Sequence, residues 1–324
     1  MSQTAATRAR PVGSEVVNPG NDLKGFTEFA TQMRIEHLYR YPVKGLTAEA
    51  LEEVHVEPGA ALPWDRAFAL AHGDAPFDPA RPAWLPKSNF MSLLRHARIA
   101  RLRASFDPHG PTLHILAPDG TTIAENPLTE TGRERLGAWL TARLGEEARG
   151  VPRFHHVPGH TFADDKAPCV SLINLATLAD FERRAGAPRD AMRFRANVYF
   201  SGAAPWSEFG WIESCVLIGG AKLRIIKRTL RCNATQVNPA TGERDADPVR
   251  ELRAAYGHAD LGVLATVVEG GRFARGDALE LLPNQSAPCG GTGSPTSGDR
   301  ARPIAARVPG PVRADEDRSE TPDR

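Results

Sequence analysis

Apolar and polar residues alternate along much of the chain, and this period of two predicts β-strands from residue 33 onward. In the first half the alternation is clearest in MRIEHLYRYPV (33–43), LEEVHVEP (51–58) and ARIARLRASF (97–106). In the second half we expect strands in NVYFSG (197–202), SCVLIGG (214–220), AKLRIIK (221–227), LGVLATVVEGG (261–271) and GDALELL (276–282). The pattern predicts a mainly β protein.

Turn residues join several of these segments into hairpins. Pro118-Asp119-Gly120 separates TLHILA from TTIAEN, and Gly219-Gly220 separates ESCVLI from AKLRIIKR. Such dipeptides supply the positive φ angles that tight β-turns need. We therefore predict two antiparallel hairpins at these positions.

Helical spacing is confined to three short segments. Thr131 and Glu134 have the spacing of a capping box, and apolar residues then recur at helical intervals until Gly145. A second helix is predicted over residues 174–184, capped by Asn174 and ended by Gly186, after a short buried strand around CVSLI. A third is predicted over residues 248–256. The fold class is thus mainly β with a few helices.

The two ends of the chain differ in composition from the part between them. Residues 1–32 and 284–324 are polar, and the second stretch is dense in Pro, Gly, Ser, Arg and Asp. Low apolar content predicts a disordered leader, or a misassigned start, and a disordered tail. Between them we expect two domains, residues 33–160 and 161–283, with the boundary between residues 149 and 165.

Charge and cysteine usage restrict the possible functions. Forty Lys and Arg stand against 39 Asp and Glu, so no global field attracts nucleic acid or an anionic membrane. No apolar run approaches the roughly 20 residues of a membrane helix. The four cysteines form no CxxC pair, which argues against an iron–sulfur cluster, a zinc ribbon or a disulfide framework. We predict a cytoplasmic protein without nucleic-acid or membrane partners.

Cys232 is the candidate for chemistry. It lies just past a predicted strand in RTLRCNATQVNPATG (228–242), next to Arg231 and near Arg228. Nearby cations favour a thiolate, which can bind a metal or act as a nucleophile. An arbitrary cysteine is more often a small buried apolar residue, and we give that interpretation to the three others, Cys169, Cys215 and Cys289.

Several longer motifs resemble a known family. RFRANVYFSG, W-S-E, LIGGAKLRIIKRTLRC, T-x-V-N-P-x-TG and GDALELL, within residues 193–282, resemble the MOSC domain, which is named for the C-terminal part of molybdenum cofactor sulfurase. RYPVKGL and W-D-R-A-F-AL resemble the MOSC N-terminal β-barrel domain. Their order and spacing are similar to the mitochondrial amidoxime-reducing component and its bacterial relatives. The resemblance implies a β-barrel-like first domain and a MOSC β-barrel second domain.

The resemblance also implies a cofactor and the residues that bind it. It implies a molybdenum cofactor, that is, molybdenum on molybdopterin, with Cys232 as the metal ligand and catalytic residue. The basic positions that match the family are Lys44, Arg66, Arg195 and Arg231. Cationic side chains at these positions suit a phosphate group. Asn197 is a further cofactor-binding candidate, for a hydrogen bond to the pterin edge, and Thr235 is a lesser one. Asn174 is a lesser candidate, and Asp164 and Asp165 match an acidic pair of the family.

Each of these residues also has an ordinary structural interpretation. Lys44 fits a solvated loop, Arg66 an ion pair with Asp65, Arg195 an outward strand face, and Asn174 a helix cap. The chain departs from the family pattern at three positions, which are Gly45, Leu230 and Asn238. These departures affect the expected cofactor geometry and substrate preference, but they keep the thiolate of Cys232.

The leading functional hypothesis is an oxidoreductase that removes oxygen from N-hydroxylated or N-oxygenated small molecules at molybdenum. Electrons must come from a separate ferredoxin or cytochrome, because no GxGxxG follows a predicted strand and no ferredoxin cysteine run occurs. One alternative is sulfur transfer through a persulfide on Cys232, although no room exists for the pyridoxal phosphate-dependent domain found in sulfurases of the family. Another is a molybdenum cofactor carrier without turnover.

Overall fold

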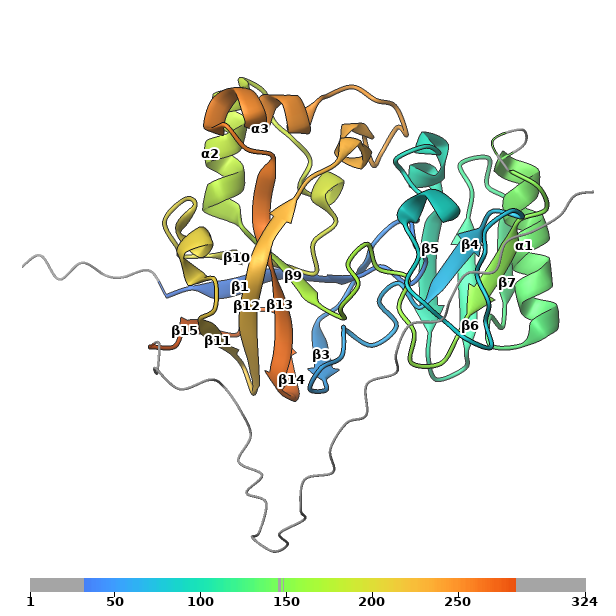
Figure 1. Ribbon diagram of the computed structural model, residues 1–324, viewed down its shortest axis with the longest axis horizontal. Coiled ribbons are helices and arrows are strands. Elements are labelled where there is room, and N and C mark those ends of the chain that lie inside the picture. Colours follow the sequence, from blue (N-terminus) through green and yellow to red (C-terminus); the bar gives the residue numbers. More distant parts are fainter. Residues whose placement is uncertain (1–31, 145–146, 148, 284–324) are drawn as a thin grey trace, which may run out of the picture. The chain divides into compact units, whose positions relative to one another are not determined.

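An eight-stranded sheet forms the centre of the protein in the computed structural model, which describes residues 32–144, 147 and 149–283. Its strand order is β15-β11-β12-β13-β9-β10-β1-β2, and it curls strongly into a half-barrel (Figure 1). The strands are β1 (Arg34–Arg40), β2 (Glu49–Ala50), β9 (Val170–Asn174), β10 (Val198–Ser201), β11 (Cys215–Ile218), β12 (Ala221–Leu230), β13 (Asp260–Glu269) and β15 (Leu279–Leu281). Strand β1, from the start of the described chain, therefore lies in one sheet with strands of the second half.

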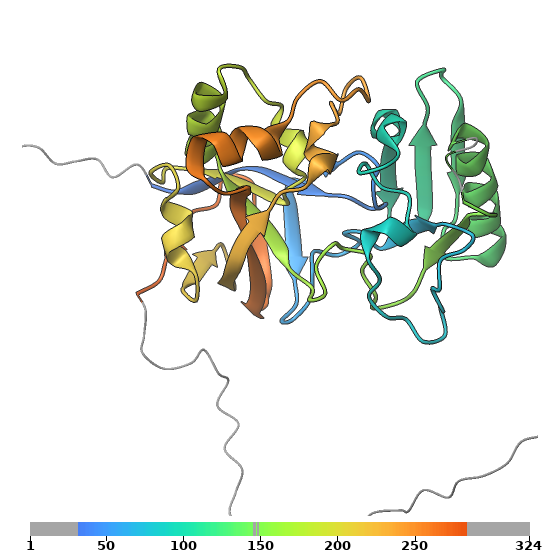
Figure 2. The same cartoon turned by 45° about the horizontal axis from the view of Figure 1, so that its top comes forward.

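Three smaller sheets complete the β structure. Strand β3 (Glu53–Val56) pairs with β14 (Gly271–Ala274), and β4 (Phe68–Ala71) pairs with β8 (Arg153–His156), both antiparallel. The third sheet has the order β5-β6-β7, made of β5 (Arg103–Asp107), β6 (Thr112–Leu116) and β7 (Thr122–Glu125). Helix α1 (Glu130–Leu144) lies beside it (Figure 1 and Figure 2).

Both predicted hairpins are confirmed. Strands β6 and β7 pair antiparallel across the turn that contains Gly120, whose φ is 83°. Strands β11 and β12 pair antiparallel across Gly219 and Gly220, and Gly219 has a φ of 53°. A side chain at Gly219 would approach the backbone oxygen of Arg272 to 2.8 Å. Glycine is needed there for its backbone conformation and for the close approach of β14.

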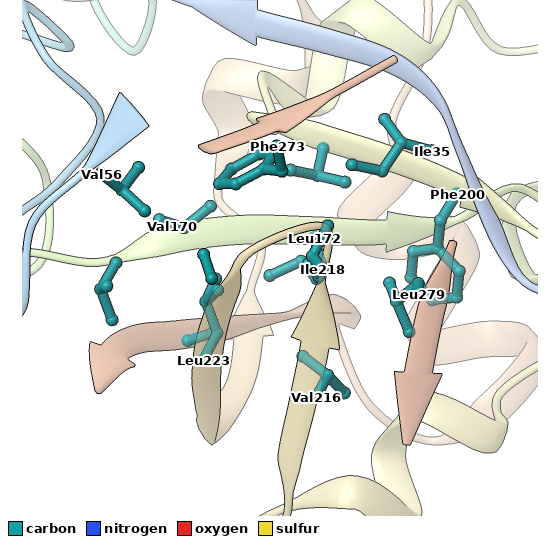
Figure 3. Close-up of a cluster of buried hydrophobic side chains, with 14 of the residues drawn as sticks. Ile35, Val56, Val170, Leu172, Phe200, Val216, Ile218, Leu223, Phe273 and Leu279 are labelled. Carbon is teal, nitrogen blue, oxygen red and sulfur yellow. The ribbon is translucent and has the colours of Figure 1, made fainter. Parts of the chain in front are cut away.

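Alternating side chains of the large sheet form the main hydrophobic core. Figure 3 shows ten labelled members of this cluster, drawn from β1, β3, β9 to β12, β14 and β15, which are Ile35, Val56, Val170, Leu172, Phe200, Val216, Ile218, Leu223, Phe273 and Leu279. Each is at most 1% exposed. A second cluster joins α1 to β4, β5, β6 and β8 through Leu136, Leu140, Phe68, Phe106, Leu113 and Phe154. Burial of these faces is the driving force that fixes the two groups of strands.

Two further helices pack against the large sheet. Helix α2 (Leu175–Ala185) begins after the cap Asn174 and ends at Gly186, as predicted. Helix α3 (Pro248–Tyr256) has the predicted bounds, with Asp247 as its cap. Both lie side by side in Figure 1, and their apolar faces form a cluster with side chains of β9 and β10.

The predicted cap of α1 is wrong by two residues. The helix begins at Glu130, and the Thr129 hydroxyl accepts a hydrogen bond from the Gly132 backbone nitrogen at 3.1 Å. Thr131 therefore lies inside the first turn instead of before it. The predicted end, Gly145, lies outside the described residues.

The predicted strand over residues 97–106 is wrong in its first half. Residues Ala97–Arg101 form a 3₁₀ helix, η2, and only Arg103–Asp107 form a strand. Backbone bonds from Ile99 to His96 and from Leu102 to Ile99 close the tight turns. Ile99 and Ala100 are both buried although they are adjacent, a pattern that a strand with one buried face does not allow.

The predicted fold class, mainly β with a few helices, is confirmed. The proposed boundary between residues 160 and 161 stays a prediction. The predicted disordered leader and tail lie outside the described residues, apart from Gln32. Among the residues that the structure describes, no helix has both the length and the apolar character that crossing a bilayer requires.

Gly262 in β13 provides a test of the central sheet. Its φ is 77°, and a Cβ there would lie 2.5 Å from the Leu172 oxygen of the neighbouring strand β9. We expect Gly262→Ala to lower the free energy of unfolding in chemical denaturation by about 2–4 kcal/mol, from left-handed strain plus a forced backbone shift.

Gly257→Ala is the matched control. Its φ is 76°, but nothing lies within 4 Å of the added Cβ. We expect it to lower the free energy of unfolding by about 1–2 kcal/mol, from backbone strain alone. Equal losses in the two variants would contradict the proposed steric contact between β13 and β9.

Candidate functional site

One cavity of about 400 Å³ is lined by every residue that the sequence placed in the site except the lesser candidate Asn174. Its volume lies within the range of small-molecule sites, roughly 300–1,000 Å³. The predicted residues that line it are Lys44, Arg66, Arg195, Asn197, Arg231, Cys232 and Thr235. The fold thus brings together positions that lie up to 191 residues apart in the chain, between Lys44 and Thr235. Their individual roles stay predictions.

The lining of this cavity carries an excess of positive charge. Three carboxylates, Asp65, Asp164 and Asp165, face eight cations, Lys44, Arg66, Lys87, Arg193, Arg195, Lys227, Arg228 and Arg231. Walls of low dielectric constant strengthen the field of such a set compared with the same charges on an open surface. The cavity is therefore suited to an anionic ligand.

Cys232 lies at the end of β12, where the chain turns into the 3₁₀ helix η6 (Asn233–Gln236). Its backbone oxygen accepts hydrogen bonds from the Thr235 backbone nitrogen at 3.0 Å and the Thr235 hydroxyl at 2.9 Å. The Cys232 side chain is half-buried, and its Sγ accepts a hydrogen bond from Lys87 Nζ at 3.1 Å. Thr235 thus holds the turn that presents the sulfur to the cavity.

Arg66 and Arg195 both stack on one buried aromatic ring. Their guanidinium carbons lie 4.3 and 4.2 Å from the centre of the Tyr41 ring. Both residues have left-handed backbones, with φ of 50° and 52°. A non-glycine residue in this region costs free energy and persists where the surrounding structure imposes it. The backbone is strained at the two places where it directs an arginine to the cavity.

Arg66 and Arg195 differ in whether a carboxylate offsets their charge. Asp65 pairs with Arg66 Nη1 at 2.5 Å, and although burial opposes the charge, the carboxylate raises the pKa of Arg66. Arg195 donates to the Leu46 oxygen at 2.6 Å and has no carboxylate partner among the described residues. Burial lowers the pKa of Arg195 to about 10, so it remains a cation at neutral pH. Most of its five N–H groups have no protein acceptor in that part of the chain.

Arg231, next to Cys232, is held by backbone oxygens alone. It donates to the Phe194 oxygen at 2.8 Å and twice to the Leu261 oxygen. Burial lowers the pKa of Arg231 to about 10 as well. Neutral acceptors leave its charge uncompensated, as at Arg195. The cavity therefore holds two half-buried cations without a carboxylate partner among the described residues, which an anion would stabilise.

Lys44, Asp164 and Lys87 form a chain of ion pairs that ends at the sulfur. Lys44 Nζ donates to Asp164 at 2.5 Å and to the Phe162 oxygen at 2.7 Å, and Lys87 Nζ lies 3.3 Å from the other Asp164 oxygen. The Asp164 side chain is 57% exposed to solvent, yet it lies within the cavity among protein atoms that disfavour a charge. The two lysines outweigh that effect and hold the pKa of Asp164 well below its usual range.

Burial and neighbouring anions act in opposite directions on the pKa of Lys44 and of Lys87, and the net shift differs between the two lysines. Burial lowers the pKa of Lys44, and Asp164 offsets this only in part. Burial also opposes the charge of Lys87, but Asp164 and Cys232 outweigh it and raise the pKa of Lys87. The net shift in pKa is therefore downward for Lys44 and upward for Lys87.

The polar groups of Asn197 and Asn174 are engaged within the protein. Asn197 Oδ1 accepts from the backbone nitrogen and hydroxyl of Ser171, and its Nδ2 donates to the Tyr39 oxygen at 3.2 Å. Asn174 caps α2 and is absent from the cavity lining. These contacts support the structural interpretation for Asn174. For Asn197, a contact to a ligand stays a prediction.

Lys87 and Cys169 are among the cavity residues that sequence reasoning missed. Lys87 follows Pro86 in a segment without a recognisable motif, so no local signal pointed to it. Cys169 was expected inside an apolar strand, but it precedes β9, is half-buried and lines the cavity. Burial, together with Asp165, raises the pKa of Cys169 to about 11, which keeps this thiol protonated. The buried interpretation of Cys215 is confirmed, and Cys289 lies outside the described residues.

Unpaired polar atoms in the lining show that the cavity suits a polar ligand. Ser92 Oγ, Arg193 Nε and Thr229 Oγ1 are buried without a hydrogen-bond partner among the described residues. Buried polar atoms are normally satisfied by protein, water or a ligand. Together with the uncompensated cations and the half-buried sulfur, they fit a group that carries both an anion and a metal with affinity for sulfur.

Comparison with known proteins gives two family matches. Residues 32–147 match the MOSC N-terminal beta barrel domain, and residues 158–280 match the MOSC domain. Mitochondrial amidoxime-reducing component 1 from Homo sapiens is 28% identical over 142 residues. This match covers 39% of the present chain and 41% of the human protein.

Two solved structures show a weak overall similarity. The YuaD protein from Bacillus subtilis is 14% identical, with a TM-score of 0.37 over 77% of this chain and 95% of that one. YiiM from Geobacillus stearothermophilus is 18% identical, with a TM-score of 0.29 over 35% of this chain and 54% of that one. The family assignment therefore depends on the sequence matches.

The ion pairs of Asp164 should appear in the pH dependence of stability. Because the pKa of Asp164 in the folded protein lies below its ordinary value of 3.8, its ionised form stabilises the fold above about pH 4, and this contribution is lost as the pH falls through the folded-state value. We expect Asp164→Asn to lower the free energy of unfolding by about 1–2 kcal/mol at pH 7, mainly because the buried Lys44 loses its partner.

Urea denaturation of both proteins between pH 7 and pH 2 measures this effect. The difference between wild type and Asp164→Asn should narrow as the pH falls below about 4. A difference that does not change with pH would show that the carboxylate charge does not stabilise the fold.

Proposed function

The chain belongs to the MOSC domain family and carries its N-terminal barrel domain, and on this premise we propose that it is a molybdenum cofactor-dependent oxidoreductase. MOSC domains are associated with molybdenum cofactor binding, and the family includes oxidoreductases such as the amidoxime-reducing component. We propose that the substrate is an N-hydroxylated or N-oxygenated small molecule. The match to the human protein supports this substrate class.

The observation that carries the proposal is a thiol in a cavity with half-buried cations that no carboxylate compensates among the described residues. Cys232 supplies a soft donor of the type that molybdenum binds, and Arg195 and Arg231 supply charge for an anion. A molybdopterin combines a metal with a phosphate, so one ligand would satisfy both features. The metal would bind at Cys232, and the phosphate would bind among Arg66, Arg195 and Arg231.

When bound, the molybdenum cofactor supplies the two-electron chemistry of oxygen removal. The protein holds Cys232 in place through Thr235 and holds Lys44 and Lys87 through Asp164. The partly buried walls limit water and strengthen the interaction of the arginines with an anion. The chain's own residues would therefore bind and orient the cofactor, and they would set the electrostatic environment around it.

We further propose that the reducing electrons come from a separate protein of the ferredoxin or cytochrome type, in the cytoplasm. The sequence supports this, because it has neither a nucleotide-binding fingerprint nor a cluster-binding cysteine run. Such a donor would deliver two electrons for each molecule of substrate.

Substitution of the cavity cysteines tests the proposed ligand. We expect Cys232→Ser, made in a host that synthesises molybdopterin, to lose at least about 100-fold of its rate on a model N-hydroxylated compound such as benzamidoxime while it keeps bound pterin. Cys169→Ser, which changes a second thiol of the same cavity, is the matched control. It should keep both the wild-type rate and the bound pterin. Metal analysis, pterin fluorescence and reduction with an artificial donor measure these properties.

Other outcomes of this experiment would favour other functions. Wild-type protein without molybdenum or pterin, but with an added sulfur on Cys232 in mass spectrometry, would favour sulfur transfer. Wild-type protein that binds the cofactor but reduces no N-hydroxylated compound would favour a carrier.

A buried cation that serves a ligand should cost stability when the ligand is absent. We expect Arg195→Met to leave the free energy of unfolding of the cofactor-free protein unchanged or higher, because it removes a half-buried charge without a carboxylate partner among the described residues. The same change should lower the pterin bound per protein by about tenfold, from the loss of a charge-assisted hydrogen bond.

Arg193→Met is the contrasting variant. Arg193 also lines the cavity, but it pairs with Asp245 and donates to the Gln236 oxygen at 2.9 Å. We expect this change to lower the free energy of unfolding by about 1–3 kcal/mol. If Arg195→Met destabilised the cofactor-free protein as much as Arg193→Met, the charge of Arg195 would be structural.

A further inference from the structure

Lys87 lies at the wall of the cavity on a short, well-fixed element. It begins the 3₁₀ helix η1 (Lys87–Asn89), which follows Pro86. The backbone nitrogen and the side-chain nitrogen of Asn89 both donate to the Pro86 oxygen at 3.0 Å, which closes the turn. The next residue, Phe90, is 3% exposed in the core. The backbone that carries Lys87 is therefore anchored on both sides.

The Lys87 side chain reaches across the cavity to the sulfur of Cys232. Its Nζ lies 3.1 Å from Cys232 Sγ and 3.3 Å from Asp164 Oδ2, and 29% of the side chain is exposed. An ammonium group has three N–H donors, and these two contacts use two of them. Asp164 is itself held by the buried Lys44. The position of the ammonium is thus set by a partner on a different segment of the chain from the sulfur.

We propose that Lys87 is a positioning residue that donates a hydrogen bond to the Cys232 thiolate and thereby raises the reduction potential of a metal bound to that sulfur. This inference rests on the proposed function, because it concerns the same site. A metal-bound thiolate keeps lone pairs that accept N–H donors, and hydrogen bonds to sulfur are among the features that set the potential of a metal centre. The ammonium withdraws electron density from the sulfur and favours the more negative, reduced state of the metal.

The chain offers a control for the effect of charge alone. Lys227 lines the same cavity, and its Nζ pairs with Asp165 at 2.5 Å. Among the described residues it makes no hydrogen bond to the sulfur. Lys227→Gln therefore removes one positive charge from the cavity. Lys87→Gln removes one charge and also shortens the side chain by one atom, which draws its N–H donors back from the sulfur. Lys87→Arg keeps both a charge and N–H donors.

The test is an EPR-monitored redox titration of the molybdenum couple in the loaded full-length protein, with metal and pterin content measured beside it. We expect Lys87→Gln to hold molybdenum and to shift the equilibrium about tenfold toward the oxidised state, which is about 59 mV for a one-electron couple. Lys227→Gln should shift it by less than half as much, and Lys87→Arg should stay close to wild type. An equal shift in Lys87→Gln and Lys227→Gln, or no shift in either, would overturn the proposal.

A different comparison is needed if the Lys87→Gln variant does not bind molybdenum. If Lys87→Gln binds no molybdenum but keeps the wild-type circular dichroism and thermal unfolding temperature, Lys87→Arg should restore binding. Failure of Lys87→Arg to restore it overturns the proposal. Wild-type protein without molybdenum would overturn the proposed function, and this inference with it. Molybdenum in wild type with an unshifted potential in Lys87→Gln overturns the role of Lys87 alone.

Discussion

The concentration of positive charge inside one cavity is the constraint on which the site depends. Arg195 and Arg231 are half-buried cations whose hydrogen-bond acceptors are backbone oxygens, and their partial burial lowers the pKa of both. Such charges are costly unless they are paired. The fold offsets the cost with carbonyl acceptors and with the Tyr41 ring, which contacts Arg195 as well as Arg66. Because these positive charges are only partly compensated in the free protein, the cavity is suited to an anion.

The sheet provides the rigidity that such an arrangement requires. Arg231 and Cys232 follow β12, and Asn197 bonds to Ser171 in β9 while its own backbone leads into β10. The strands behind them have a continuous hydrophobic core. Other chain segments supply Lys44, Arg66 and Lys87 to the cavity lining. Because the backbone at Arg66 and Arg195 is left-handed, local preference alone would not place these side chains, and the surrounding contacts must do so.

Cys169 and Cys232 line the same cavity but have different charged neighbours. Burial, together with the nearby Asp165, raises the pKa of Cys169 to about 11. Cys232 instead accepts a hydrogen bond from the ammonium of Lys87. A neighbouring anion disfavours the thiolate, whereas a neighbouring cation favours it. This difference supports the choice of Cys232 as the proposed ligand.

The sequence by itself determined the features that depend on neighbouring residues. The hairpins at Gly120 and Gly219, the bounds of α3 and the cap of α2 follow from local turn and capping chemistry. The motif around Cys232 identified the sulfur, and the family resemblance supplied the basic positions. Only the tertiary structure placed Lys87 against that sulfur, because this contact joins residues 145 positions apart. It also decided that Cys169 lines the cavity and that residues 97–101 form a 3₁₀ helix, since packing against distant segments overrides local alternation.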